Sequence, residues 1–167
     1  GLDFSVKMLA AARAKFPGIE LIKADLLGDW PIDREQRFDR IVSGYAFHEL
    51  DLSSKVRLIK RLVRDHLAPG GRMIVGDISF PTAAARDDAQ RRWQGTWDEA
   101  KQEWHGSLWD EAEHYWAADE ASEALRYSGV DLSYTQVSFC GGVYVVRPEE
   151  PGQGGSEGSS RDATAGR

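Results

Sequence analysis

Short, continuously apolar segments alternate with segments of helical periodicity along this chain. The apolar runs are IELIKAD (19–25), FDRIVSG (38–44) and RMIVGDISF (72–80). Strands that are apolar along their whole length are typical of a parallel sheet with helices on both faces. VDLSYTQVSF (130–139) and VYVV (143–146) predict two further strands, joined through Cys140–Gly142 as an antiparallel hairpin at the edge. The pattern therefore predicts an α/β fold of Rossmann-like architecture.

The helical segments between these strands have recognisable ends. Ser5 is a predicted N-cap, and Pro17–Gly18 is expected to end the helix that follows it. A second helix is predicted from Asp51 to about His66, ended by a tight turn at LAPGG (67–71). The region from residue 82 to 125 is expected to be mostly helical, and it holds five tryptophans: Trp93, Trp97, Trp104, Trp109 and Trp116. They are expected mostly to pack helices onto the sheet, or else to form an aromatic acceptor pocket.

The composition is that of a globular domain with a tail. The 167 residues carry a net charge of −6 with basic residues spread among acids, which argues against a nucleic-acid partner. No apolar run reaches the length of a membrane span, and no signal peptide is apparent. One cysteine, Cys140, excludes an internal disulfide; a cytoplasmic location is expected, with Cys140 a small buried hydrophobe. The last segment is rich in Gly and Ser, so a domain over 1–147 and a disordered tail over 148–167 are predicted.

Polar residues follow the predicted strands at their carboxyl ends. Asp3, Asp25, the Ser43–Gly44–Tyr45 segment and Asp77 each occupy such a position. Ligands of open α/β sheets bind beyond the carboxyl ends of the strands, so these residues predict a shared cleft. The alternative for Asp3 is a helix cap, and for Asp25 an acid that begins a loop. Asp77 either touches a substrate or caps the loop after it.

Four segments in this order resemble the motifs of class I S-adenosylmethionine-dependent methyltransferases: GLDFSVKML, ELIKADLL, FDRIVSGYAFHEL and LAPGGRMIVGDISF. The resemblance runs from residue 1 to about 146 and is closest to small bacterial enzymes of the YrrT-like type. It implies S-adenosylmethionine as cofactor and methyl transfer to a small molecule as function. On this resemblance, Asp3 would bind the ribose hydroxyls and Phe4 would lie on the adenine. Asp25 would accept from the adenine amino group, Leu26 would pack on the ring, and Ser43 and Tyr45 would line the methionine end.

His48 follows the third strand and would face the substrate in that family. It is a candidate general base for an acceptor that loses a proton; the alternative is a histidine that only hydrogen-bonds a loop. His105 and His114 lie among acids, but their spacing is not that of a zinc site, and no metal is expected.

The glycine-rich loop that the family places before the ribose-binding acid is not found in this sequence. We expect a truncated domain that binds the cofactor weakly or not at all by itself, with the strand edges beside the missing strand left open. One alternative function is a non-catalytic module whose partner, or second copy, completes the sheet. Another is a nicotinamide-dependent dehydrogenase, because Asp3 would suit that ribose too, although no Tyr-x-x-x-Lys pair supports it. No membrane partner is expected.

Overall fold

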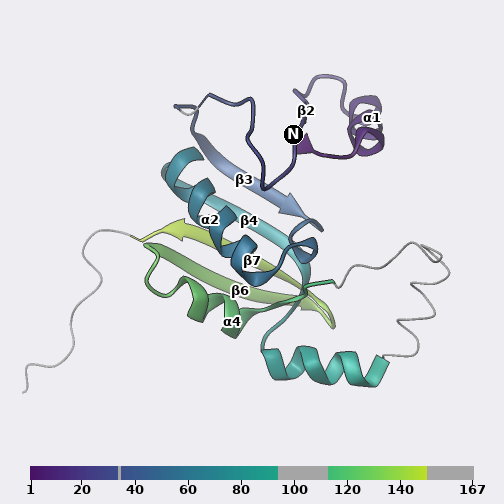
Figure 1. Cartoon of the computed structure of the whole chain (residues 1–167), viewed down its shortest axis with the longest axis vertical. Coiled ribbons are helices and arrows are strands. Elements are labelled where there is room, and N and C mark those ends of the chain that lie inside the picture. The colour runs from purple at the N-terminus through teal and green to yellow at the C-terminus, as the bar shows by residue number, and fades with distance from the viewer. Residues whose placement is uncertain (34, 94–112, 150–167) are drawn as a thin grey trace, which may run out of the picture.

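The computed structural model describes residues 1–33, 35–93 and 113–149 (Figure 1). Residues 83–93 are helical. The other elements, in chain order, are β1 (Leu2–Asp3), α1 (Val6–Lys15), β2 (Ile22–Lys23), β3 (Phe38–Gly44), the 3-10 turn η1 (Phe47–Glu49), α2 (Leu52–His66), β4 (Leu67–Phe80), β5 (Trp116–Ala117), α4 (Ala118–Leu125), β6 (Val130–Ser138) and β7 (Gly141–Pro148). None of the helices in these described ranges is long and apolar enough to cross a membrane.

The main sheet has the order β3-β4-β7-β6, with β5 beside the end of β4 (Figure 1). β3 runs parallel to β4, whereas β7 is antiparallel to both β4 and β6. This arrangement confirms the α/β fold with an antiparallel hairpin at one edge. The register places Ser43 beside Val75 and Gly44 beside Gly76, so the carboxyl end of β3 lies next to the middle of β4.

β1 and β2 form a separate two-stranded parallel sheet, in which Leu2 pairs with Ile22 and Asp3 with Lys23. The expected shared cleft is thus divided between two sheets in the described part of the chain. The loop after β2 joins them through Trp30: the Arg61 guanidinium on α2 lies 4.2 Å from the Trp30 ring centroid and donates a 2.6 Å hydrogen bond to the Gly28 carbonyl.

Helix α2 follows from its sequence pattern. The Asp51 carboxylate accepts a 2.7 Å bond from the Ser54 amide, which caps the first turn. Leu58, Ile59 and Leu62 recur at helical spacing and are buried. They pack in one core with sheet residues that are also buried, among them Met73, Val75, Tyr144 and Val146. Removing this apolar stripe from water is the main stabilising contribution of the helix.

Three details differ from the predicted elements. LAPGG belongs to the start of β4, where the pairing with β3 slips by several residues and Gly70 adopts a φ of 71°. Gly141 and Gly142 lie inside β7, so the hairpin turn is at Phe139–Cys140. The short strand β5 was not predicted, because two residues carry no period and its pairing with β4 is a tertiary contact.

Candidate functional site

A buried carboxylate and a histidine meet where β3 ends beside β4. The Nδ1 atom of His48 lies 2.7 Å from Oδ1 of Asp77, whose side chain is fully buried. Asp77 also accepts hydrogen bonds from the backbone amides of His48, at 2.9 Å, and Ile78, at 2.8 Å. With Nδ1–H donating to an ionised Asp77, the lone pair of a neutral His48 is on Nε2. That nitrogen lies 3.4 Å from Oε1 of Glu49.

The environment of His48 raises its pKa above the ordinary value of 6.5. The hydrogen bond to Asp77 is the largest cause, and burial opposes it by disfavouring the charged ring. The charges of Asp77, Glu49 and Glu113 raise the pKa further. His48 therefore has the properties of a proton acceptor held in one tautomer by a carboxylate, as general bases often are.

The turn that carries His48 is fixed by the core below it and by the chain beside it. Phe47 is buried, and its ring centroid lies 5.5 Å from that of Trp116. The His48 carbonyl accepts a 2.8 Å bond from the amide of His114. Just before the turn, Tyr45 adopts a positive φ of 52°, a conformation that costs energy in residues other than glycine. It leaves the Tyr45 ring 74% exposed.

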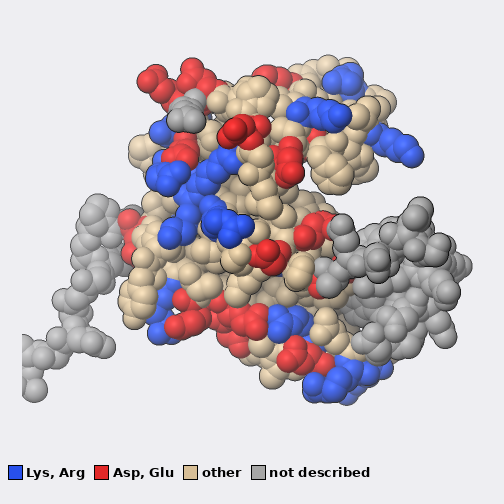
Figure 2. All heavy atoms as spheres, viewed as in Figure 1, with Lys and Arg blue, Asp and Glu red and all other residues tan. Residues whose placement is uncertain are grey.

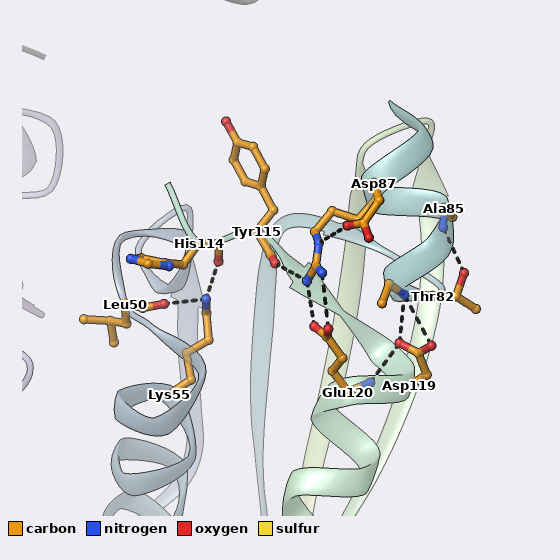
Figure 3. Close-up of polar contacts among 11 residues, drawn as sticks. Leu50, Lys55, Thr82, Ala85, Asp87, His114, Tyr115, Asp119 and Glu120 are labelled. Carbon is orange, nitrogen blue, oxygen red and sulfur yellow. Dashed lines mark hydrogen bonds and ion pairs between the residues drawn. The ribbon is translucent and has the colours of Figure 1, made fainter. Parts of the chain in front are cut away.

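A pocket of about 330 Å³ is lined by His114, whose amide bonds to the His48 carbonyl, whereas His48 and Asp77 themselves are not part of its lining. α2 contributes Lys55 to its wall, the helical residues 83–93 contribute Arg86, and the chain around β5 contributes Glu113, Trp116 and other residues. Figure 3 shows Lys55 and Glu120 reaching toward the two sides of the segment that contains Tyr115. Arg86 closes the second side, with a 2.6 Å ion pair to Glu120 and a 3.2 Å ion pair to Asp87.

The predicted cofactor-binding acids lie at the carboxyl end of the small sheet, with Asp3 as the last residue of β1 and Asp25 two residues after β2. Asp3 Oδ1 accepts a 2.7 Å bond from the Ser5 amide, and Asp25 Oδ1 accepts a 2.8 Å bond from the Leu27 amide. Both bonds stabilise local turns, and the cap of α1 is Ser5, so Asp3 does not itself cap that helix. Phe4 is 73% exposed, whereas Leu26 is half-buried and packs against the main core. Within the described residues, no hydrogen bond or ion pair joins Asp3 or Asp25 to His48 or Asp77.

The other predicted residues have diverse positions. Ser43 is half-buried near the end of β3, and Cys140 is half-buried beside the small core cluster around Phe80. Trp116 is buried in the main core and Trp93 is 43% exposed; Trp97, Trp104, Trp109 and His105 lie outside the described residues, as does most of the predicted tail. His114 is exposed, and the part of the chain that the structure describes holds no group of three or more potential metal ligands.

Two features of this site, the partnership of Asp77 with His48 and the burial of Lys55, give no signal in the sequence. Asp77 was noted for its place in the strand, but not as the partner of His48, because 29 residues separate them. Lys55 was not noted at all. It reads as an ordinary lysine of an amphipathic helix, and only its burial in the structure distinguishes it.

Comparison with protein families and curated relatives gives consistent results. Residues 1–71 match a model described as a methyltransferase domain. The chain is 34% identical over 88 residues to an uncharacterized methyltransferase of Oceanobacillus iheyensis, covering 53% of this chain and 40% of that protein. It is also 34% identical over 101 residues to a 2-phytyl-1,4-naphtoquinone methyltransferase of Thermosynechococcus vestitus, covering 58% and 42%. The chain thus spans about two fifths of the length of these relatives.

Solved structures share the fold. A complex of DhpI with SAH matches with a TM-score of 0.62 and 20% identity, over 89% of this chain and 64% of that one. An S-adenosylmethionine-dependent methyltransferase from Mesorhizobium loti matches with a TM-score of 0.60 and 20% identity, over 88% and 78%. At this identity the likeness establishes the fold, which is the methyltransferase-like α/β fold.

Proposed function

We propose that this chain carries a domain of the class I S-adenosylmethionine-dependent methyltransferase family, because residues 1–71 match a methyltransferase-domain model. We further propose that His48 and Asp77 serve methyl transfer to a small acceptor that loses a proton. The observation that carries the proposal is the 2.7 Å contact between the His48 ring and the fully buried Asp77 carboxylate. It lies where the carboxyl end of β3 meets β4. The neighbouring His114, which bonds to the His48 carbonyl, lines a pocket large enough for a small molecule.

The residues present fit S-adenosylmethionine, which when bound supplies a methyl group activated on a sulfonium. Asp3 uses Oδ1 for the Ser5 amide, and the described residues give its Oδ2 no hydrogen bond, so that oxygen is available to a ribose hydroxyl. The exposed Phe4 ring is suited to cover an adenine, with Asp25 and Leu26 beside it in the family's pattern. Ser43 and the exposed ring of Tyr45 would line the methionine end, where an aromatic face stabilises a cation.

His48 would take the proton that the acceptor atom releases as that atom forms its new bond to carbon. The proton goes to Nε2, while Nδ1–H stays hydrogen-bonded to Asp77, which compensates the imidazolium charge. Since the pKa of His48 is raised, the neutral base is present only above that pKa. Methyl transfer is therefore expected to rise with pH through the His48 pKa and to level off above it.

The proposal is tested first by binding. S-adenosyl-homocysteine is titrated calorimetrically into this chain and into a version extended with the upstream coding sequence, and both proteins are examined for the bound ligand by mass spectrometry. Saturable binding by the extended version, weakened by Asp3→Ala, is expected. Absence of binding in both versions contradicts the proposal. NAD serves as the competing ligand, and preferential binding of NAD would favour the dehydrogenase.

His48→Gln tests the catalytic role. Removing a general base lowers turnover by about 100- to 10,000-fold, whereas the affinity for S-adenosyl-homocysteine is expected to stay within about twofold, a difference of less than 1 kcal/mol. The extended version is screened for methylated products with small phenols, thiols and carboxylic acids as acceptors. Unchanged turnover in His48→Gln would contradict the role of His48 as general base and would leave the positioning of cofactor and acceptor as the source of catalysis.

A second candidate function is association without catalysis. In the described residues β3 pairs only with β4, and Val42 on β3 is 72% exposed. An open strand edge can accept a strand from a partner chain or a second copy. Sedimentation of the chain separates the candidates: a stable oligomer that Val42→Lys dissociates, without ligand binding, favours the module.

We further propose the YrrT-like subtype, which product identification on the extended version would test.

A further inference from the structure

We propose that Lys55 is a positioning residue of the methyl-transfer site, holding the His48 turn and the chain that enters β5 together. The inference rests on the proposed function, since it gives Lys55 its purpose through His48. It goes beyond that function because Lys55 touches no reacting atom and acts on His48 through the backbone.

Lys55 is buried, and its ammonium contacts two backbone carbonyls and an aromatic ring. Lys55 is 2% exposed, and a lysine is almost never so fully buried without a partner. The ammonium donates to the Leu50 carbonyl, at 2.5 Å, and to the His114 carbonyl. It also lies 5.6 Å from the centroid of the Trp116 ring. Figure 3 shows the two carbonyls converging on the amine from different parts of the chain.

These two carbonyls belong to the segments that border His48. Leu50 caps the end of η1, two residues after His48. His114 donates its amide to the His48 carbonyl at 2.8 Å and offers its own carbonyl to Lys55. The ammonium therefore closes a ring of backbone hydrogen bonds around the turn whose side chain bonds to Asp77. If the ring opens, the turn loses the contacts that tie it to Leu50 and His114.

Burying the Lys55 ammonium costs free energy of desolvation, so its hydrogen bonds must compensate for that cost. Burial lowers the pKa of Lys55 to about 8, while the charges of Asp77, Asp51 and Glu120 raise it and that of Arg86 lowers it. Among the described residues, Lys55 forms no ion pair with any carboxylate, whereas Arg86 across the pocket pairs with two. The carbonyls of Leu50 and His114 and the face of the Trp116 ring interact with the ammonium in place of a carboxylate. Such contacts are suited to a side chain that holds two backbone segments together.

The test follows the His48 ring by NMR and needs neither cofactor nor acceptor. The ring nitrogens of uniformly labelled protein are titrated, with the His48 signals assigned from His48→Gln. Lys55→Met removes the donors at similar length, Lys55→Arg keeps them, and Lys60→Met is the matched control on the exposed face of α2. In Lys55→Met we expect the single Nδ1–H tautomer to give way to a mixture and the pKa of His48 to fall toward 6.5. Lys55→Arg and Lys60→Met should retain the native tautomer and pKa.

The sign of the shift separates positioning from charge. If Lys55 acted only through its positive charge near Asp77, removing that charge would raise the pKa of His48. A raised or unchanged pKa in Lys55→Met, with the tautomer intact, would overturn the proposal. If Lys55→Met fails to fold, Lys55→Leu, which also removes the donors, is measured instead with the same criteria. Failure of cofactor binding would overturn the proposed function but leave these ring signals unaffected.

Discussion

At the scale of single residues, the buried carboxylate of Asp77 fixes both the ring and the backbone of His48. Its two oxygens accept from the His48 ring, the His48 amide and the Ile78 amide, so the charge is compensated by hydrogen bonds instead of by an ion pair with Lys or Arg. Removing such a group leaves buried donors without partners, which costs more than the hydrogen bonds contribute. Asp77, which accepts three hydrogen bonds, therefore fixes the orientation of the His48 ring.

Asp77→Asn is expected to lower the pKa of His48 toward or below 6.5, because the hydrogen bond and charge of Asp77 are the main causes that raise it. A histidine whose folded pKa is raised stabilises the protein fully below its unfolded pKa, and this contribution is lost as pH rises through the folded pKa. The difference in free energy of unfolding between wild type and Asp77→Asn should therefore be larger at about pH 5.5 than at about pH 8.5. Urea denaturation at both pH values measures it; a difference that grows with pH would contradict the assignment.

At the scale of elements, α2 begins where the sequence predicts a helix, and the structure adds that Asp51 caps its first turn. Asp51 accepts from the Ser54 amide and from the Ser53 hydroxyl, and these bonds lower its pKa from 3.8 to about 2. Asp51→Ala should lower the melting temperature at neutral pH. The contribution of Asp51 is present above its unfolded pKa and is lost as pH falls toward 2, so the two proteins should converge there. Circular dichroism melts follow this, with Asp29→Ala in an exposed loop as control.

The hairpin depends on one close approach between strands. A Cβ at Gly142 would lie 2.2 Å from Cε2 of Tyr134 and 2.6 Å from Oγ of Ser79. Gly142→Ala should therefore destabilise the protein by about 1–3 kcal/mol through overpacking. Gly18→Ala is the control, because its Cβ would meet nothing within 4 Å. Equal urea midpoints for the two variants would show that β6 and β7 can shift apart at little cost.

At the scale of the whole molecule, two sheets are joined through few contacts. Figure 2 shows acidic and basic groups interspersed over this face, with Lys and Arg atoms gathered over α2, where Arg57, Lys60 and Arg64 are exposed. Arg61 differs from these neighbours because it turns to Trp30 and Gly28 of the N-terminal segment. It links the small sheet, with Asp3 and Asp25, to the main body.

Arg61→Ala is expected to increase amide hydrogen exchange in residues 1–30 while leaving β4 and β7 protected. The reason is that the variant loses both the stacking on Trp30 and the bond to the Gly28 carbonyl, so local opening of the segment becomes easier. Exchange measured by mass spectrometry resolves the two regions. Arg64→Ala, whose side chain is 75% exposed and pairs with Asp65, is the control. Uniform acceleration across the chain would show that the segment does not open independently.

Local signals account for what could be predicted. The Ser5 cap, the stripe of α2 and the strand over 38–44 act over a few residues, and the structure confirms them. The order of these segments also led to the family resemblance. The predicted shared cleft of Asp3, Asp25, Ser43 and Asp77 is divided between two sheets, because pairing between distant strands depends on the tertiary arrangement.

The sequence by itself determined most of the elements and the α/β class, because helix and strand periods and caps are short-range properties of the chain. The prediction that Asp77 ends its strand is wrong, since β4 continues to Phe80 along β7. Only the tertiary structure decided that the His48 ring meets Asp77, that Lys55 is buried on two carbonyls, and that Arg61 holds the N-terminal segment. Apart from the bond of Lys55 to Leu50, these contacts join residues that are distant in sequence: 29 positions for His48 and Asp77, 59 for Lys55 and His114, and 33 for Arg61 and Gly28. No local preference specifies such partners; packing of the core brings them together.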